Sequence, residues 1–297
     1  MKNILLTSLL LAQSLFAADS IATWFEEGTV KGNIKYYFIE TKKDKADSSN
    51  TSDHANAVGG TLNYTTGNLY GFSTGATLMT TNGFALPNSV DASILGKDNG
   101  IRLKDDNGSI AQDSFSVLGE VFVKYTYEDL TLLYGRKVIT TPLIDSKLVR
   151  MLPSAVQGAF VDYKMDKVTL GASYLTHFKQ RTSDEFTNIV KHALGDNTRL
   201  VTGSDKGEVI VADVVYKSDK TTFKLYDYYA DDFMNSFYVD VDIKNTIDSG
   251  WTFNAGYQYI YQTSVGNADD YFSTAGSLTG GKKISSNAIG KLTIINI

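Results

Sequence analysis

The chain has 297 residues, no cysteine, 25 glycines and only 3 prolines, and it carries 28 basic against 33 acidic side chains. The absence of cysteine excludes disulfide scaffolds, thiolate zinc sites, iron–sulfur clusters and cysteine nucleophiles. A net charge of −5 argues against a general nucleic-acid binder, which needs a basic surface to neutralise phosphates. Beyond the first segment there is no apolar stretch of about 18 residues, so helical membrane spans are not expected.

The first segment has the layout of an export signal. Lys2 supplies one positive charge, residues 4–16 are largely apolar, and the small residues Ala17 and Ala18 stand directly before Asp19. The apolar run is shorter than the roughly 20 residues that a membrane-spanning helix needs. We therefore expect a signal peptide at residues 1–17, cleaved after Ala17 or Ala18, and a mature chain, residues 18–297, that works outside the cytoplasm.

Alternation of apolar and polar residues dominates the mature chain and predicts antiparallel β-strands. In residues 236–246, for example, Phe237 and Val239 alternate with Tyr238 and Asp240. Twelve runs follow the pattern, the last one more weakly than the others. In chain order they are residues 30–39, 57–66, 69–80, 116–128, 130–138, 158–165, 168–177, 207–218, 221–230, 236–246, 251–262 and 286–297.

Short and long connections alternate between these runs. The short ones, rich in residues that tolerate tight turns, are residues 66–68, 128–129, 166–167, 218–220 and 245–250. The long, hydrophilic ones are residues 40–56, 81–115, 139–157, 178–206 and 263–285, and only residues 231–235 break the alternation. This rhythm is typical of outer-membrane β-barrels, whose tight turns lie in the periplasm and whose long loops lie outside. Lipid offers no hydrogen bonds to a sheet edge, so such strands are expected to close into a barrel.

One of the long loops carries a family resemblance. A strand ending in Gly135-Arg136 is followed by residues 141–146 (TPLIDS) and 150–153 (RMLP). This pattern resembles the third-loop signature of the OprD family of outer-membrane porins. Residues 24–28 (WFEEG), which lead into an expected strand, are similar to the N-terminal opening of that family. The likeness runs from about residue 20 to about residue 262.

The resemblance implies an all-β fold, an antiparallel transmembrane barrel whose third loop, about residues 140–157 here, folds into the lumen and narrows the pore. It also implies passive diffusion of amino acids, short peptides or carboxylates across the outer membrane of a Gram-negative bacterium. The expected partners are these small hydrophilic solutes and outer-membrane lipid, not nucleic acid, and a homo-oligomer stays open.

The family's barrels have about 18 strands, whereas about 12 are visible here, and the sequence ends in Asn296-Ile297 rather than in an aromatic residue. A truncated or frame-shifted family member is the simplest explanation, since closure needs every strand to find a partner. A genuine 12-stranded barrel is the alternative.

Charge placement determines which hydrated solutes a passive pore admits. Around the signature, Arg136, Lys137, Lys147 and Arg150 stand against Asp145, a local excess of three positive charges. We expect these five residues to form a basic constriction that favours solutes with a carboxylate.

Arg136 and Lys137 have opposite strand parity, so only one of them would point inward in a regular strand. The resemblance favours Arg136, although this choice would also turn Leu132 and Tyr134 inward. On other strands, a charge that faced lipid at mid-membrane would cost about 2–4 kcal/mol for Lys or Arg, so the charged face is expected to be lumenal. The expected wall charges are Lys31, Lys35, Glu120, Lys124, Lys224, Asp240 and Asp242.

No constellation in the sequence supports catalysis, a metal site or a cofactor. The histidines, His54, His177 and His192, do not have metal-site spacing, and no HExxH or Walker pattern occurs. The adjacent carboxylates at residues 231–232 and 269–270 lack a calcium-ligand loop. We therefore expect no enzyme and no cofactor. The alternative function is an outer-membrane receptor or adhesin that acts through its long loops.

Overall fold

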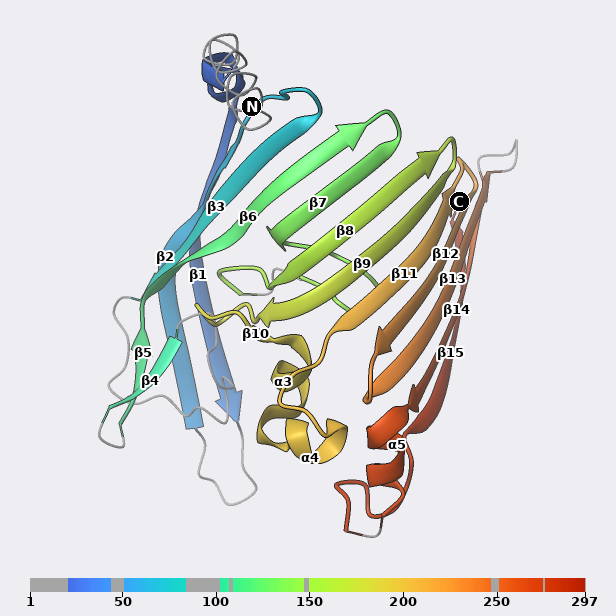
Figure 1. Ribbon diagram of the computed structural model, residues 1–297. Coiled ribbons are helices and arrows are strands. Elements are labelled where there is room, and N and C mark those ends of the chain that lie inside the picture. Colours follow the sequence, from blue (N-terminus) through green and yellow to red (C-terminus); the bar gives the residue numbers. More distant parts are fainter. Residues whose placement is uncertain are drawn as a thin grey trace, which may run out of the picture. The chain divides into compact units, whose positions relative to one another are not determined.

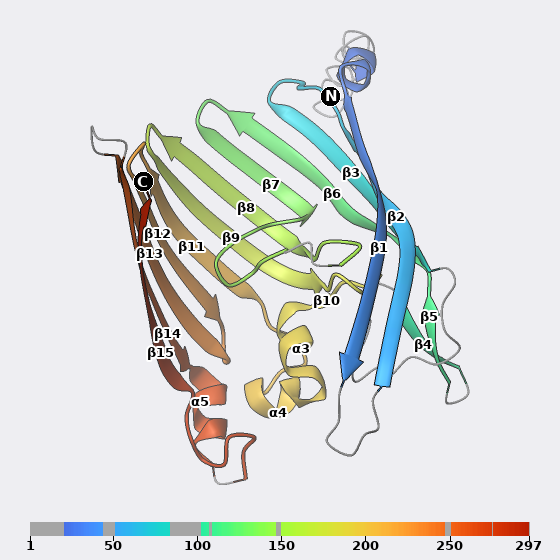
Figure 2. The same ribbon diagram turned by 180° about the vertical axis from the view of Figure 1, so that it is seen from behind.

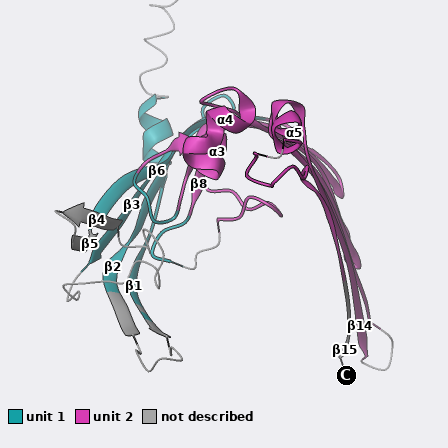
Figure 3. Cartoon of the chain, turned by 90° about the horizontal axis from the view of Figure 1, so that it is seen from below, with its two compact units in different colours: residues 1–126, 148–153, 181–184 teal, residues 127–147, 154–180, 185–297 magenta. Residues whose placement is uncertain are grey.

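The computed structural model describes residues 21–43, 51–83, 102–106, 109–146, 150–246, 251–274 and 276–296. The chain forms two compact units (Figure 3). Unit 1 comprises residues 1–126, 148–153 and 181–184, and unit 2 comprises residues 127–147, 154–180 and 185–297. The expected signal peptide and its cleavage site lie outside the described residues.

Unit 1 is built on four antiparallel strands that pair in chain order (Figure 1). They are β1 (Thr29–Lys43), β2 (Thr51–Thr65), β3 (Phe72–Gly83) and β6 (Phe115–Tyr127). A separate hairpin pairs β4 (Arg102–Asp106) with β5 (Ser109–Asp113). This hairpin lies inside a connection that was expected to be irregular, and its strands are too short for alternation to show. Strand β2 also begins earlier than the alternation predicts, at Thr51.

Unit 2 continues the same chain-order pairing, because each strand follows its neighbour through a turn or a loop. Its strands are β7 (Leu130–Lys137), β8 (Ala155–Met165), β9 (Val168–Lys179), β11 (Val209–Lys217), β12 (Thr221–Ala230), β13 (Met234–Thr246), β14 (Thr252–Ser264) and β15 (Ser285–Asn296). A short strand, β10 (Thr187–Asn188), pairs with β9. All twelve expected runs coincide with strands of this 13-stranded antiparallel sheet, which confirms the all-β prediction.

Alternation gives the sheet of unit 1 two different faces. Its apolar face carries large exposed side chains, and Ile34 is 90% exposed. Its polar face carries a hydrogen-bonded row across three strands, in which Asn63 Nδ2 donates to Thr77 Oγ1 at 2.7 Å and Thr77 Oγ1 donates to Glu120 Oε2 at 2.6 Å. A sheet with an exposed apolar face and a satisfied polar face suits a lipid-facing wall rather than a water-exposed one.

The sheet of unit 2 has the same division. The exposed side chains on its apolar face include Tyr134, Val161, Tyr174, Ile210, Tyr257 and Ile289. The cross-strand register puts Asp162, Asp213, Lys224, Asp240 and Gln258 on the opposite, polar face. The part of the chain described here contains no helix long and apolar enough to span a membrane.

The two longest described connections of unit 2, which were expected to be long and hydrophilic, contain short helices (Figure 2). These are α3 (Ile189–Leu194), η1 (Gly195–Asn197), α4 (Thr198–Thr202) and α5 (Gly266–Phe272). Helices α4 and α5 share a small core of Val201, Ala268 and Phe272. Helices this short are stabilised by tertiary packing rather than by their own sequence, so no periodicity predicted them.

Asn267 joins the two helical loops. Its Nδ2 donates to the Thr202 carbonyl at 3.0 Å, and its backbone amide donates to Asp232 Oδ1 at 3.0 Å. Asp232 thereby satisfies one of the free amides in the first turn of α5.

We expect Phe272→Ala to unfold the α4–α5 region locally while leaving the strands intact. Phe272 is 3% exposed, and truncating a buried phenylalanine costs about 3–5 kcal/mol, which is large compared with the stability of a loop. Amide hydrogen exchange should show lost protection in residues 198–202 and 266–272. The control, Leu278→Ala, removes a side chain that is 60% exposed in the same loop. Equal loss of protection in both variants would contradict this packing role.

The local stability of α3 should depend on pH through His192. The His192 ring lies 4.7 Å from the Phe178 ring, and burial lowers its pKa below the ordinary value. The unfolded segment therefore binds a proton at higher pH than the folded one, so the stabilisation is complete above about pH 6.5 and is lost as the pH falls below it. Hydrogen exchange of residues 189–194, corrected for intrinsic rates, should speed up from pH 7.5 to 5.5. In His192→Phe this dependence should disappear.

Candidate functional site

The loop that follows β7 lies on the polar face of unit 2. The backbone amide of Leu143 donates to the Tyr228 hydroxyl at 3.3 Å. Tyr228 is 5% exposed and lies on the polar face, opposite Val211 and Ser236 in the register. The start of the expected constriction loop is therefore anchored to the wall at β12.

The sequence folds this loop locally through a tight turn. Pro142 restricts the backbone at the second turn position, and the Thr141 amide donates to the Ile144 carbonyl at 2.8 Å. The Ile144 amide donates back to Thr141 Oγ1 at 3.1 Å, and Thr140 forms a bridge with Asp145. The turn presents Leu143, at its tip, to Tyr228.

Arg136 and Lys137 are held by different aromatic rings. The Arg136 Cζ lies 4.2 Å from the centre of the Phe186 ring, and its Nε donates to Gln157 Oε1 at 3.1 Å. The Lys137 Nζ lies 5.7 Å from the centre of the Phe160 ring. Phe186 was missed at the sequence level because it lies in a distant loop without periodicity.

Strand alternation places Lys137 on the side of Leu133, which is 7% exposed, and Arg136 on the side of Tyr134, which is 69% exposed. Gly135, directly before Arg136, has a φ of +140°. The resemblance therefore favours Arg136 as the inward residue, whereas regular alternation favours Lys137.

The other residues of the expected constriction are separated in the chain. Arg150 belongs to unit 1, where its carbonyl accepts a hydrogen bond from Lys35 Nζ at 3.1 Å. Lys35 lies on the polar face of β1, so residue 150 lies over that face. Asp145 lies in the bridge described above, and Lys147 lies outside the described residues.

All four wall charges expected in unit 1 share its polar face. Lys31 pairs with Asn63 in the register, Asn63 with Thr77, and Thr77 with Glu120. Lys35 has the same parity as Lys31. On the neighbouring strand, Lys124 pairs with Ser73, which is 4% exposed.

The wall charges expected in unit 2 include a close ion pair. Lys224 Nζ lies 2.7 Å from Asp240 Oδ2, with side-chain exposures of 34% and 14%. Asp242 follows on the same face, opposite Gly256. Because Lys224 largely neutralises Asp240, Asp240 and Asp242 do not act as the simple acidic couple that their spacing indicates.

Two further carboxylates lie on this face and were not singled out from the sequence. Asp162 and Asp213 both lie opposite Gly171 in the register, and a Cβ placed on Gly171 would come within 2.3 Å of Asp213 Oδ1. The missing side chain at Gly171 thus leaves room for the Asp213 carboxylate. The sequence did contain a signal for Asp213. It is the polar residue in an otherwise apolar run, and it has the same strand parity as Val211.

Three tyrosines border these carboxylates. The Tyr226 and Tyr228 rings stack at 5.9 Å, and the Tyr226 and Tyr238 rings meet edge to face at 6.4 Å. Tyr226 lies directly opposite Asp213 in the register. We call Asp162, Asp213, Tyr226, Tyr228 and Tyr238 the acidic–tyrosine patch. Its three tyrosines are buried, so the half-buried carboxylates are the groups that can receive a cation.

Comparison with known proteins agrees with this architecture. A family model described as outer membrane porin, OprD family, matches residues 22–286. Pseudomonas aeruginosa OpdK with vanillate is similar at a TM-score of 0.69 and 17% identity, over 92% of this chain and 65% of that chain. P. aeruginosa OccK8 (OprE) gives 0.70 and 18% over 92% and 66%, and a BenF-like porin from Pseudomonas fluorescens gives 0.70 and 14% over 92% and 65%.

At these identities the solved structures show a shared fold. The chain spans a little less than two thirds of the length of these relatives. No curated protein sequence matches it. Because the family model covers most of the sequence, and because the solved porins share its sheet over nearly all of its length, the chain belongs to the OprD family of porins, which reside in the outer membrane of Gram-negative bacteria.

Proposed function

We propose that this protein is exported by its signal peptide, residues 1–17, and acts as a porin for passive diffusion of small hydrophilic solutes. In each unit the polar face is the side that meets the solute, and the loop at about residues 140–157 narrows the pore. The observation that carries this proposal is the hydrogen bond from Leu143 to Tyr228, which holds the loop on a polar face instead of letting it extend from the strand ends.

The charges on the polar faces define the solute class. Unit 1 presents Lys31, Lys35 and Lys124 with Glu120 on its polar face. The expected constriction residues, Arg136, Lys137, Lys147 and Arg150 against Asp145, add positive charge at the loop, and both sets favour a carboxylate. In unit 2 the acidic–tyrosine patch offers partners to an ammonium or guanidinium group. Amino acids and short peptides carry both kinds of group. The similarity to OpdK, which was solved with vanillate, supports carboxylates as a further class.

Conductance of the folded chain in a planar bilayer under a salt gradient tests the proposal. Discrete single-channel steps with a defined reversal potential are expected. A chain that shows a folded β spectrum but no conductance would contradict the porin function and favour the receptor or adhesin alternative.

Removing two basic groups near the loop should shift ion selectivity toward cations. We expect Arg136→Gln with Arg150→Gln to raise the cation-to-anion permeability ratio at least about twofold, because local counter-ion concentration follows the lumenal charge. The matched control is Arg199→Gln, which removes an arginine whose side chain is 75% exposed at α4. An unchanged reversal potential in the double variant would show that these arginines do not line the constriction.

Tyr228→Phe should loosen the loop without altering the wall. It removes the hydroxyl that accepts the Leu143 amide but keeps the ring stacked on Tyr226. A net hydrogen bond contributes about 0.5–1.5 kcal/mol, so displaced loop states should rise about two- to tenfold. Greater open-channel current noise is the expected readout. In the control, Tyr229→Phe, the hydroxyl lost is one that bonds Asp231, and the noise should stay at the level of the unmodified protein.

A further inference from the structure

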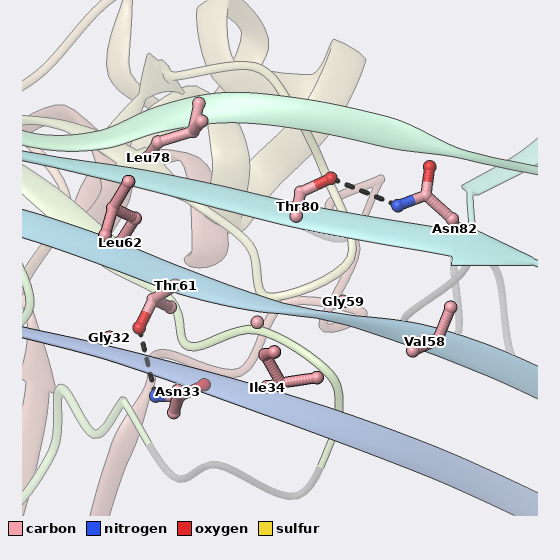
Figure 4. A pocket seen from close by; sticks show the side chains of 11 residues that line it. Gly32, Asn33, Ile34, Val58, Gly59, Thr61, Leu62, Leu78, Thr80 and Asn82 are labelled. Carbon is pink, nitrogen blue, oxygen red and sulfur yellow. Dashed lines mark hydrogen bonds between the residues drawn. The ribbon is translucent and has the colours of Figure 1, made fainter.

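A groove of about 730 Å³ opens on the apolar face of unit 1, across β1, β2 and β3 (Figure 4). Its apolar walls are Ile34, Val58, Leu62 and Leu78, all more than 40% exposed. Its volume is within the range of about 300–1,000 Å³ that small-molecule sites occupy in proteins. The groove lies on the face opposite the polar row, so it takes no part in the lumen described above.

Gly60 keeps the floor of the groove free of side chains. It stands opposite Ile34 and Thr80 in the register, and a Cβ at Gly60 would lie 2.0 Å from the Asn33 carbonyl oxygen. Gly60 also has a φ of +149°, which side-chain-bearing residues rarely adopt. Because the neighbouring backbone approaches so closely, no side chain can fill the depression from this position.

One end of the groove is polar. Asn82 Nδ2 donates to Thr80 Oγ1 at 3.3 Å, and Thr80 Oγ1 lies 2.8 Å from Ser116 Oγ. Both Thr80 and Asn82 lie near the end of β3, at Gly83, which leads into a long connection. In outer-membrane barrels the long connections are extracellular, so the polar end points toward the outer leaflet.

We infer that this groove binds one acyl chain of lipopolysaccharide from the outer leaflet. The chain lies along Ile34, Leu62 and Leu78, and the ester or amide that joins it to the sugar meets the hydroxyl of Thr80 and the amide of Asn82. The groove is continuous with the apolar face, which in an outer-membrane protein is the interface with lipid. A second protein copy fits less well, because a stable interface buries about 1,200–2,000 Å² and would need a ridge complementary to the groove.

Native mass spectrometry of the full chain tests this inference, after reconstitution with lipopolysaccharide or with phosphatidylethanolamine and release under identical activation. One retained lipopolysaccharide per chain is expected. Gly32→Leu fills the groove, where a Cβ would lie 3.2 Å from the Thr61 carbonyl oxygen, and Leu62→Ala removes a wall. Each should reduce retention at least about fivefold, since a buried aliphatic side chain carries much of such a contact.

The matched control is Val123→Ala, which truncates an apolar side chain of similar exposure on β6, outside the groove (54% against 56% for Leu62). It should retain lipid as the unmodified chain does. Equal retention in Leu62→Ala and Val123→Ala, equal retention of phosphatidylethanolamine, or a dimer without lipid would each overturn the inference. The readout is independent of conduction, so it stands or falls separately from the porin function. If Gly32→Leu does not fold, Leu78→Ala takes its place.

Discussion

The constraint on which the structure depends is that a strand in lipid must pair its backbone with neighbouring strands and must turn alternate side chains to opposite sides. Chain-order antiparallel pairing meets the first demand for the strands between β1 and β15. The second separates side chains such as Ile34 and Leu62 from Lys31 and Glu120. Every site considered above is a consequence of this separation, because polar groups that would be costly toward lipid gather on one face.

Gathering polar groups on one face creates a second demand, which cross-strand pairs satisfy. Thr77 connects Asn63 with Glu120 in unit 1, and Lys224 meets Asp240 in unit 2. Such pairs fix side-chain positions and partly cancel charge. A count of charged residues therefore overstates the electrostatic field that a solute experiences at the polar face. The carboxylates of Asp162 and Asp213 are instead bordered by tyrosines. The polar face of unit 2 therefore carries one carboxylate paired with a lysine, Asp240, and two that lie beside aromatic side chains.

Glycine residues leave depressions on both faces of a sheet whose surface would otherwise be uniform. Gly171 leaves room for the Asp213 carboxylate on the polar face of unit 2, and Gly60 forms the floor of the groove on the apolar face of unit 1. In each case the depression exists because a neighbouring atom occupies the place of a side chain. The carboxylate position and the acyl-chain groove therefore share one structural origin.

The sequence alone determined the strands, their alternating faces and the family, because period-two patterning and the signature at residues 141–153 are local properties of the chain. It also placed Lys31, Glu120 and Asp240 on the polar face through parity. Tertiary structure alone decided the short helices, the partner of Arg136 at Phe186 and the anchoring of Leu143 on Tyr228. These depend on register and packing between segments far apart in the chain, and a pattern read along one strand carries no information about which residue stands opposite.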